Sequence, residues 1–540
     1  MKVDLDLPGF DADAPLEFVD ARGFKEWLKL VPMINVRQAH TEILDTLARL
    51  NRAPVPPVER IKMLEMLREP LSLLQEENTK RYAGKPFPLA EAEAAVWHSN
   101  VTLWREMSIG YRHCWRAALD GESGISDYVA LAGQRSIRYT ALAIREHHLA
   151  YRVVSELAWS ELFALFRLAE NNEHSVKIVK DSQNRQTELS SCAAAFSQAL
   201  LLAAANPSAM SIKQILWVDR LLDRWSNQTP LLVNPPQDCD KGMLTLQLDQ
   251  PGEAKRLDPP PRGETFRYID TDSLARSIRK RIKYLRAGES PAQLGLGEEY
   301  SATASESYLI SLYQEWCDMP VDRALPRHTA EGIAEITTTM EQSYTFIGGA
   351  PFDLPERPSE IHGRAITDFQ LFGNVAQHVS AKAEVAAQHV ETERWDIINQ
   401  SALGFRLSRT SPGQRVAHHQ LLAIRPAPGQ PIVLGTIRWI KQGENDALEA
   451  GIRILPGIPK TIAVRATGLN TFSNKFTPAL MLPPVTALQT QPSLVLPLHW
   501  FKAGRILEVY QDGQIRRMRL DGLLERGLDF ERISFSGALH

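Results

Sequence analysis

The residues with the clearest chemical potential lie in one short stretch, RWDIINQSALGFRLSR at 394–409. Within it, Asn399 offers two donors and an acceptor, and Ser401 offers a hydroxyl; both side chains are compact enough for a tight corner. Gly404 permits a close approach that a side chain would block. This polar turn follows a short apolar run, so the stretch predicts either a plain hairpin corner or the edge of a binding site.

Three arginines flank this corner: Arg394, Arg406 and Arg409. A guanidinium group binds phosphate through paired donors and stacks on flat bases, which an ammonium group does poorly. The chemistry therefore favours a flat, phosphorylated ligand, if the corner is a site.

After Trp395 the hydrophobic period changes from about 3.6 to 2, which indicates strands. The segments QLLAIRP, IVLGTIRWIKQ and LEAGIRIL alternate in this way and are separated by the turn-rich APGQP and GENDA. Further on, RILEVYQDGQIRRMRL predicts a hairpin that turns at Asp512-Gly513. We expect antiparallel strands over most of residues 395–540.

Asn399-x-Ser401-x-x-Gly404, followed by these strands, resembles the PilZ domain, the bacterial receptor module for cyclic di-GMP. The resemblance covers about 395–465 and implies a six-stranded β-barrel with this motif at its ligand edge. It also implies that Asn399 and Ser401 give polar contacts to cyclic di-GMP and that Gly404 allows close backbone approach. In the family, an R-x-x-x-R pair in the arm before the barrel clasps the ligand. Here Arg394 alone stands at that place, as its nearest equivalent in an atypical PilZ domain.

The first half of the chain is typical of helices. In 36–50 apolar residues recur every three or four positions, and the pattern returns at 61–74, 90–119, 134–170, 185–205 and 211–226. Short breaks between the segments indicate an antiparallel bundle or a helical stack.

A change of composition marks residues 229–263, where prolines cluster around the short alternating segment GMLTLQL. A second helical block follows, and it contains RSIRKRIKYLR at 276–286. This basic helix can meet an anionic partner or nucleotide, although a solvated face opposite its apolar stripe explains the same pattern.

The predicted fold is a multidomain α+β chain, with all-α regions followed by one or two PilZ-like antiparallel β-barrels. We expect a terminal extension (1–34), a helical domain (35–230), a Pro-rich linker (231–265), a second helical region (266–392), a PilZ-like barrel (393–465) and a second, more degenerate β domain (466–540).

The composition excludes several classes of protein. With 540 residues and a net charge of −3, the chain is not a general nucleic-acid binder. Its 4 cysteines lie far apart, which argues against a metal site or disulfide framework. The N-terminus lacks a signal peptide, and the most apolar stretch, 194–205, is too short for membrane insertion. We therefore expect a cytoplasmic protein. No nucleophile elbow or phosphate-binding loop stands in a fitting context, so the sequence favours neither an enzyme nor a cofactor.

Two functional hypotheses remain open. In the first, a PilZ-like barrel senses cyclic di-GMP and the N-terminal helices engage a protein partner. In the second, the chain is a helical interaction scaffold, or a chaperone-like protein, whose barrels are purely structural.

Overall fold

The structure is a computed structural model. It describes residues 5–11, 16–237, 242–318, 328–329, 332–352, 391–443, 445–467 and 475–537. The chain divides into two compact units, Met1–Lys85 with Leu89–Asp322, and Pro86–Pro88 with Arg323–His540, and each unit is described by itself.

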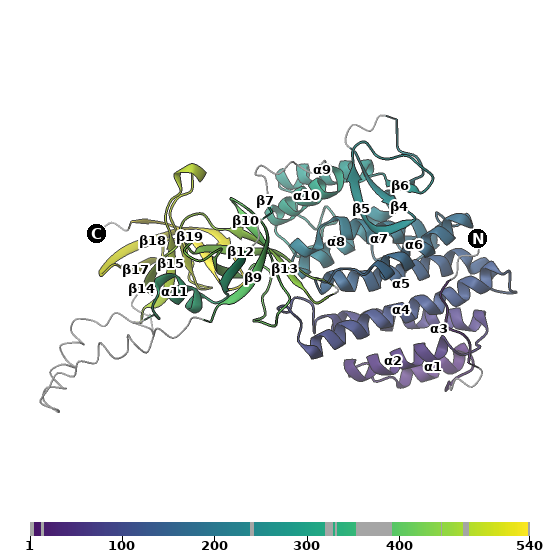
Figure 1. Cartoon of the computed structure of the whole chain (residues 1–540). Coiled ribbons are helices and arrows are strands. Elements are labelled where there is room, and N and C mark those ends of the chain that lie inside the picture. Colours follow the sequence, from purple (N-terminus) through teal and green to yellow (C-terminus); the bar gives the residue numbers. More distant parts are fainter. Residues whose placement is uncertain are drawn as a thin grey trace, which may run out of the picture. The chain divides into compact units, whose positions relative to one another are not determined.

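The first unit is built on helices that pack against their neighbours along the chain, α3 on α4 and α4 on α5 (Figure 1). Its helices are α1 (Ala21–Leu30), α2 (Val36–Leu50), α3 (Pro57–Thr79), α4 (Glu91–Leu119), α5 (Val129–Leu149), α6 (Glu156–Asn171), α7 (Cys192–Ala204), α8 (Ile212–Trp225), α9 (Asp272–Arg286) and α10 (Ala302–Cys317). The predicted helical character of residues 35–230 is confirmed.

Local capping decides where several of these helices begin. Ser211 accepts from the backbone N–H of Gln214 at 3.3 Å, while the Gln214 side chain accepts from the Ser211 N–H at 2.7 Å, a complete capping box for α8. The pattern expected over 134–170 is two helices instead of one, because Ser155 caps a new helix, α6.

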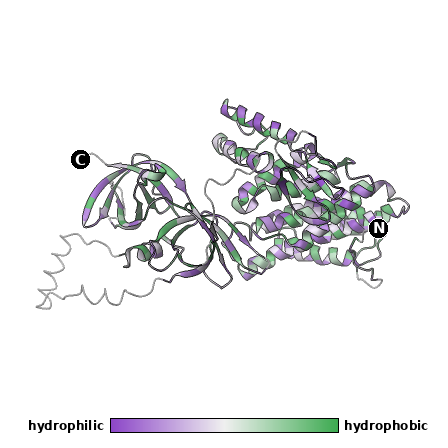
Figure 2. Cartoon of the chain, turned by 45° about the horizontal axis from the view of Figure 1, so that its top comes forward, coloured by the Kyte–Doolittle hydropathy of each residue, from purple (hydrophilic) through white to green (hydrophobic). Residues whose placement is uncertain are grey.

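The most apolar stretch of the chain forms α7, which lies in the core of this unit. Phe196, Leu200 and Leu201 are fully buried, and the ring of Phe196 stacks on that of Phe166 with centroids 4.2 Å apart. Other helices are amphipathic, with hydrophobic and hydrophilic faces visible as green and purple in Figure 2. Within the described residues, no helix is long and apolar enough to cross a membrane.

Small sheets complete the first unit. The strands are β1 (Val179–Lys180), β2 (Leu189–Ser190), β3 (Leu231–Leu232), β4 (Met243–Gln247), β5 (Gln250–Leu257) and β6 (Phe266–Ile269). β1 pairs with β2, and the other four form a sheet in the order β3-β6-β4-β5. Residues 231–265, expected to be a linker, therefore contain strands. The reason is that Leu244 and Leu246 of β4 are buried, each 3% exposed.

The second unit begins with a barrel of six strands. Its elements are β7 (His328–Thr329), β8 (Ile333–Thr337), α11 (Met340–Gly348), β9 (Glu393–Ser401), β10 (Gly404–Arg409), β11 (Leu421–Arg425), β12 (Val433–Gln442) and β13 (Leu448–Ile454). The antiparallel circuit runs β9-β10-β13-β12-β11-β8 and returns to β9, while β7 pairs with the far end of β9. The six-stranded barrel expected from the PilZ resemblance is confirmed.

One strand of the first barrel comes from a part of the chain that we did not expect to contribute to it. β8 comes from the region that we expected to be helical, 266–392, and it pairs with both β9 and β11. Residues 353–390 of that region lie outside the described part of the chain. A five-residue strand such as IAEIT is too short to give a clear alternation, so its sequence does not reveal it.

A second closed barrel follows, with strands in the order β14-β15-β16-β19-β18-β17. These strands are β14 (Lys460–Ala466), β15 (Thr477–Leu482), β16 (Ser493–Leu496), β17 (Ile506–Gln511), β18 (Gln514–Arg526) and β19 (Glu531–Gly537). The predicted hairpin is confirmed: Asp512 and Gly513 have φ values of 50° and 80°, as a two-residue turn of this hand requires.

The two barrels share part of their hydrophobic core. Leu421 and Leu434 of the first barrel cluster with Leu480 and Val495 of the second, and Phe346 of α11 joins them. The multidomain α+β class is thus confirmed. The boundaries of the six predicted segments as domains stay a prediction.

Candidate functional site

The corner predicted from the sequence is the turn between β9 and β10. Ser401 and Gly404 face each other in the ladder, so Ala402 and Leu403 form a two-residue loop. The Ser401 hydroxyl accepts from the Leu403 N–H at 3.4 Å and donates to the Gly404 carbonyl at 3.5 Å. Both distances are long for hydrogen bonds, so the hydroxyl is held weakly and can turn to another partner.

Gly404 has a reason within the barrel to be glycine. A Cβ at this position would lie 2.2 Å from the backbone carbonyl oxygen of Ile452 on β13. This contact is closer than any side chain tolerates, so the strand pairing alone demands glycine. Its presence in the motif therefore carries no independent evidence for a ligand.

Asn399 is the residue of the corner whose side chain has an unsatisfied hydrogen-bond acceptor. It faces Arg406 on β10 and Thr329 on β7 in the two ladders. Its Oδ1 atom is buried and has no hydrogen-bond partner among the described residues. An unsatisfied buried acceptor costs about 1–3 kcal/mol, so a ligand N–H at this point would be favoured.

Arg394 lies away from the corner. It is an exposed residue within β9, five positions before Asn399, which corresponds to about 16 Å along the strand. Glu335, which faces Arg394 across the ladder, is paired instead with Arg425 at 2.9 Å. The structure thus brings Asn399, Ser401 and Gly404 together and leaves Arg394 apart, inside the barrel strand instead of in an arm before it.

The other two flanking arginines serve the barrel. Arg406 donates to Glu449 Oε2 from Nε at 3.2 Å and from Nη2 at 2.8 Å. Arg409 pairs with Glu393, and its guanidinium lies over the ring of Trp395, 4.8 Å from the centroid. Both guanidinium groups are therefore already neutralised by glutamates.

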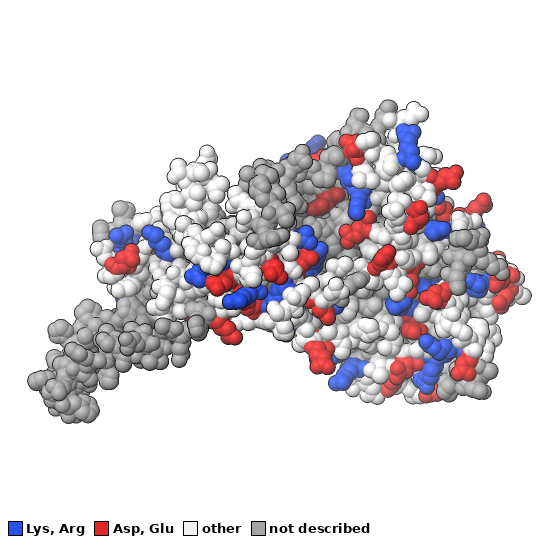
Figure 3. All heavy atoms as spheres, viewed as in Figure 1, with Lys and Arg blue, Asp and Glu red and all other residues white. Residues whose placement is uncertain are grey.

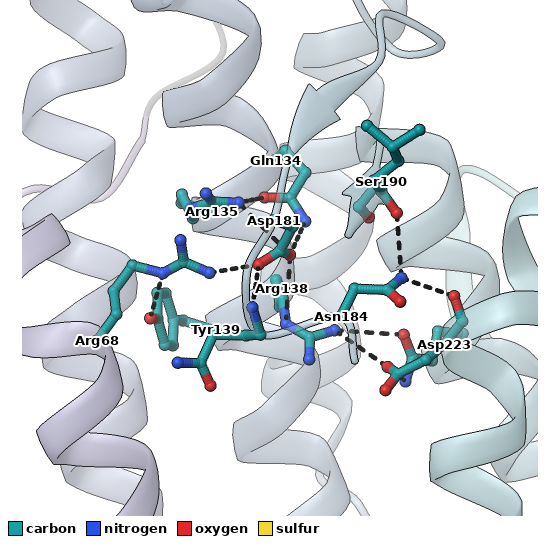
Figure 4. A network of polar contacts seen from close by, with 12 residues as sticks. Arg68, Gln134, Arg135, Arg138, Tyr139, Asp181, Asn184, Ser190 and Asp223 are labelled. Atoms are coloured by element: carbon teal, nitrogen blue, oxygen red, sulfur yellow. Dashed lines mark hydrogen bonds and ion pairs between the residues drawn. The ribbon is translucent and has the colours of Figure 1, made fainter. Parts of the chain in front are cut away.

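The sequence did not reveal a polar network inside the first unit, centred on Asp181 (Figure 4). Arg68 donates to its carboxylate, Gln134 donates at 3.1 Å, and Arg135 and Arg138 lie within 3.4 and 3.7 Å. Burial opposes ionisation, but the three guanidinium groups outweigh it and hold the pKa of Asp181 well below its usual range. The network ties α3 and α5 to the β1–β2 hairpin.

A cleft of about 490 Å³ adjoins this network, and we call it the α3–α8 cleft. Its cations have carboxylate partners. Examples are Arg145 with Asp219 at 3.1 Å and Arg185 with Glu76 at 3.4 Å. Burial and the charge of Asp219 raise the pKa of Asp223, another lining residue, to about 6, although Arg138 opposes the shift.

A second hollow lies between α8 and α9, and we call it the α8–α9 groove. Its volume is about 550 Å³. The side chains that line it include three cations, an aromatic ring, two amides and a hydroxyl: Arg224, Lys280, Arg281, Tyr284, Gln228, Gln293 and Ser277. No aspartate or glutamate is among the described residues that line the groove. The signal that pointed here is the basic helix RSIRKRIKYLR, for which the sequence left a solvated face as the alternative.

Within the described ranges, no three His, Cys, Asp or Glu side chains come close enough together to hold a metal ion.

Known proteins resemble this chain at both ends. Residues 22–237, which include α2 to α8, match a family model described as the N-terminal domain of the cyclic-di-GMP receptor FimW. Residues 462–538, which make up the second barrel, match the model of the FimW C-terminal beta-barrel domain. A curated protein of Pseudomonas aeruginosa named Cyclic-di-GMP receptor FimW is 23% identical over 549 residues, covering 94% of this chain and 89% of that protein. The chain is thus similar to a cyclic-di-GMP receptor along almost its whole length, with a FimW-type N-terminal domain and a FimW-type C-terminal barrel.

Proposed function

We propose that this chain is a cytoplasmic, non-enzymatic receptor for cyclic di-GMP that passes the signal to a protein partner. One observation carries the proposal: the relative named as a cyclic-di-GMP receptor aligns with 94% of this chain and 89% of its own length. An alignment of that extent supports a shared architecture and, with it, a shared ligand.

The β9–β10 corner is our first candidate for ligand contact. In this proposal Ser401 donates to a phosphate or base oxygen, and the unpartnered Oδ1 of Asn399 accepts from a guanine N–H. Gly404 keeps the turn close to β13 and leaves the corner open. Arg394 contacts only a ligand that extends along β9, because of its distance from the turn.

The proposed partner of the helical unit is a protein rather than a nucleic acid. Figure 3 shows basic and acidic side chains interspersed on the visible face of this unit, where a nucleic-acid binder would carry a continuous basic stripe. The net charge of −3 agrees with this assignment. The helices then act as the output surface of the receptor.

Calorimetric titration of the full chain with cyclic di-GMP tests the function, with cyclic di-AMP and GTP as matched controls. We expect saturable binding that the controls do not reproduce. Asn399→Ala or Ser401→Ala is expected to weaken binding roughly 2- to 12-fold, the value of one neutral hydrogen bond. No binding at millimolar cyclic di-GMP would refute the receptor and favour the scaffold with structural barrels.

A further inference from the structure

The α8–α9 groove concentrates positive charge that no carboxylate of the described residues neutralises. Arg224 projects from α8, and Lys280 and Arg281 project from α9. Neither Arg224 nor Lys280 forms an ion pair with any carboxylate of the described residues. Burial, and then the nearby charge of Arg224, lowers the pKa of Arg281. Two guanidinium groups thus repel each other across a hollow, and a bound anion would relieve this repulsion.

One of these guanidinium groups is held in place by the fold. Arg281 Nε donates to the Leu294 carbonyl at 3.0 Å, and Nη1 donates to the Ser277 carbonyl at 3.2 Å. Its guanidinium also lies over the ring of Trp225, 5.6 Å from the centroid. Because these contacts fix the side chain in advance, little conformational entropy is lost when Arg281 meets a ligand.

The groove also offers groups suited to the rest of a nucleotide. Tyr284 is half-buried, and the ammonium group of Lys280 lies 5.7 Å from its ring centroid. A half-buried aromatic ring can stack on a base, as in many single-strand binding sites. Gln293 accepts from Ser290 at 2.9 Å through Oε1, which leaves its amide nitrogen to donate. The volume of about 550 Å³ is within the usual range for ligand sites.

We propose that the α8–α9 groove is a second binding site, specific for a nucleotide phosphate, in which Arg224, Lys280 and Arg281 contact the phosphate and Tyr284 stacks on the base. The identity of the nucleotide as cyclic di-GMP rests on the proposed function. The helical unit then has a ligand site of its own, separate from the β9–β10 corner, and the nucleotide acts directly on the helices.

Equilibrium binding to the full chain tests the groove, with cyclic di-GMP and inorganic pyrophosphate as separate probes. Arg224→Ala and Lys280→Ala are each expected to weaken the binding of both probes about 10- to 150-fold, the effect of losing one charge-assisted contact. Arg276→Ala is the matched control, because Arg276 is exposed on the same helix as Lys280 and, among the described residues, its side chain bonds to Ser273 alone, at 3.0 Å. Its binding should equal that of the wild type, and thermal unfolding should show that all three variants fold.

The two probes separate this inference from the proposed function. If cyclic di-GMP binds the wild type and both groove variants equally, while Ser401→Ala loses affinity, the groove proposal is overturned and the receptor stands. If pyrophosphate binds through the groove but cyclic di-GMP does not bind at all, the groove stands and the receptor function is overturned. If neither probe binds the wild type, both proposals are wrong.

Discussion

The β9–β10 corner and the α8–α9 groove both gather arginines, but they use them differently. At the corner, Arg406 and Arg409 pair with glutamates of the same barrel, and Gly404 satisfies a contact with β13. In the groove, Arg224 and Lys280 form no ion pair with any carboxylate of the described residues. An arginine whose ion pair stabilises the fold is weak evidence for a ligand site. A charge without a carboxylate partner in the fold is stronger evidence for one.

The largest effect predicted by this comparison is on the stability of the first barrel. Arg409→Ala removes the cation that balances Glu393 in a largely buried position, although Trp395 and Gln414 still donate to the carboxylate, so we expect a loss of about 3–5 kcal/mol. Urea unfolding of the full chain, followed by a signal from the barrels, measures it. Arg394→Ala, in the same barrel but exposed, should change stability by less than about 0.5 kcal/mol. Equal effects in the two variants would contradict the structural role of Arg409.

The α3–α8 cleft should respond to pH through Asp223. Its pKa of about 6 in the folded protein lies above the unfolded value of about 3.9, so the folded state binds the proton more tightly. The contribution of Asp223 to stability should therefore be greatest below about pH 4 and fall by up to about 3 kcal/mol as the pH rises to about 6. Urea unfolding between pH 4 and 7 measures this decline.

Asp223→Asn is the informative variant for the pH effect, because the amide can keep the contact with Gln198, which now lies 3.2 Å from the carboxylate. We expect the free energy of unfolding of this variant to lack the decline between pH 4 and 7. Asp127→Asn, which changes an exposed aspartate of the same unit, should retain it. A decline that survives in Asp223→Asn would show that another group titrates.

A smaller effect is expected at the turn of the corner. Gly404→Ala forces β10 away from the Ile452 carbonyl, which should cost about 1–3 kcal/mol. Gly537→Ala serves as control, since nothing lies within 4 Å of a Cβ there. Suppose that Gly404→Ala folds with wild-type stability but no longer binds cyclic di-GMP. Glycine at this position would then be required for ligand binding, and the structural explanation of the corner would be wrong.

The smallest effect should come from the groove. Lys280→Ala and Arg224→Ala remove charges that no described carboxylate balances, so we expect stability within about 0.5 kcal/mol of the wild type, or a slight gain. Differential scanning calorimetry without ligand measures it. A destabilisation above about 2 kcal/mol would show that these cations serve the fold.

Local patterns made much of this fold predictable. The apolar stripes over 35–230 gave the helices, and Asp512-Gly513 gave a hairpin of the second barrel, because both depend on residues close together in the chain. The motif Asn399-x-Ser401-x-x-Gly404 was correctly placed at a turn of a six-stranded barrel.

Non-local partners explain what the sequence could not reveal. Arg68 meets Asp181 across 113 positions of the chain, and no local pattern announces that pairing. In the same way, the glutamate partners of Arg406 and Arg409 became visible only once the strands were paired. The basic helix at 276–286 was recognised, but its neighbour Arg224 lies on a different helix, so the groove itself was not.

The strand β8 has a consequence for the order of events in folding. It completes the first barrel, yet its partners β9 and β11 lie beyond the long segment between Thr337 and Glu393. On a ribosome, β8 emerges well before the strands that it must join, so barrel closure waits for their synthesis. The entropic cost of bringing two distant parts of a chain together grows only with the logarithm of their separation, about 0.6 kcal/mol per doubling. The registers in which β8 pairs with β9 and β11 therefore matter more for barrel closure than the number of residues that separate these strands.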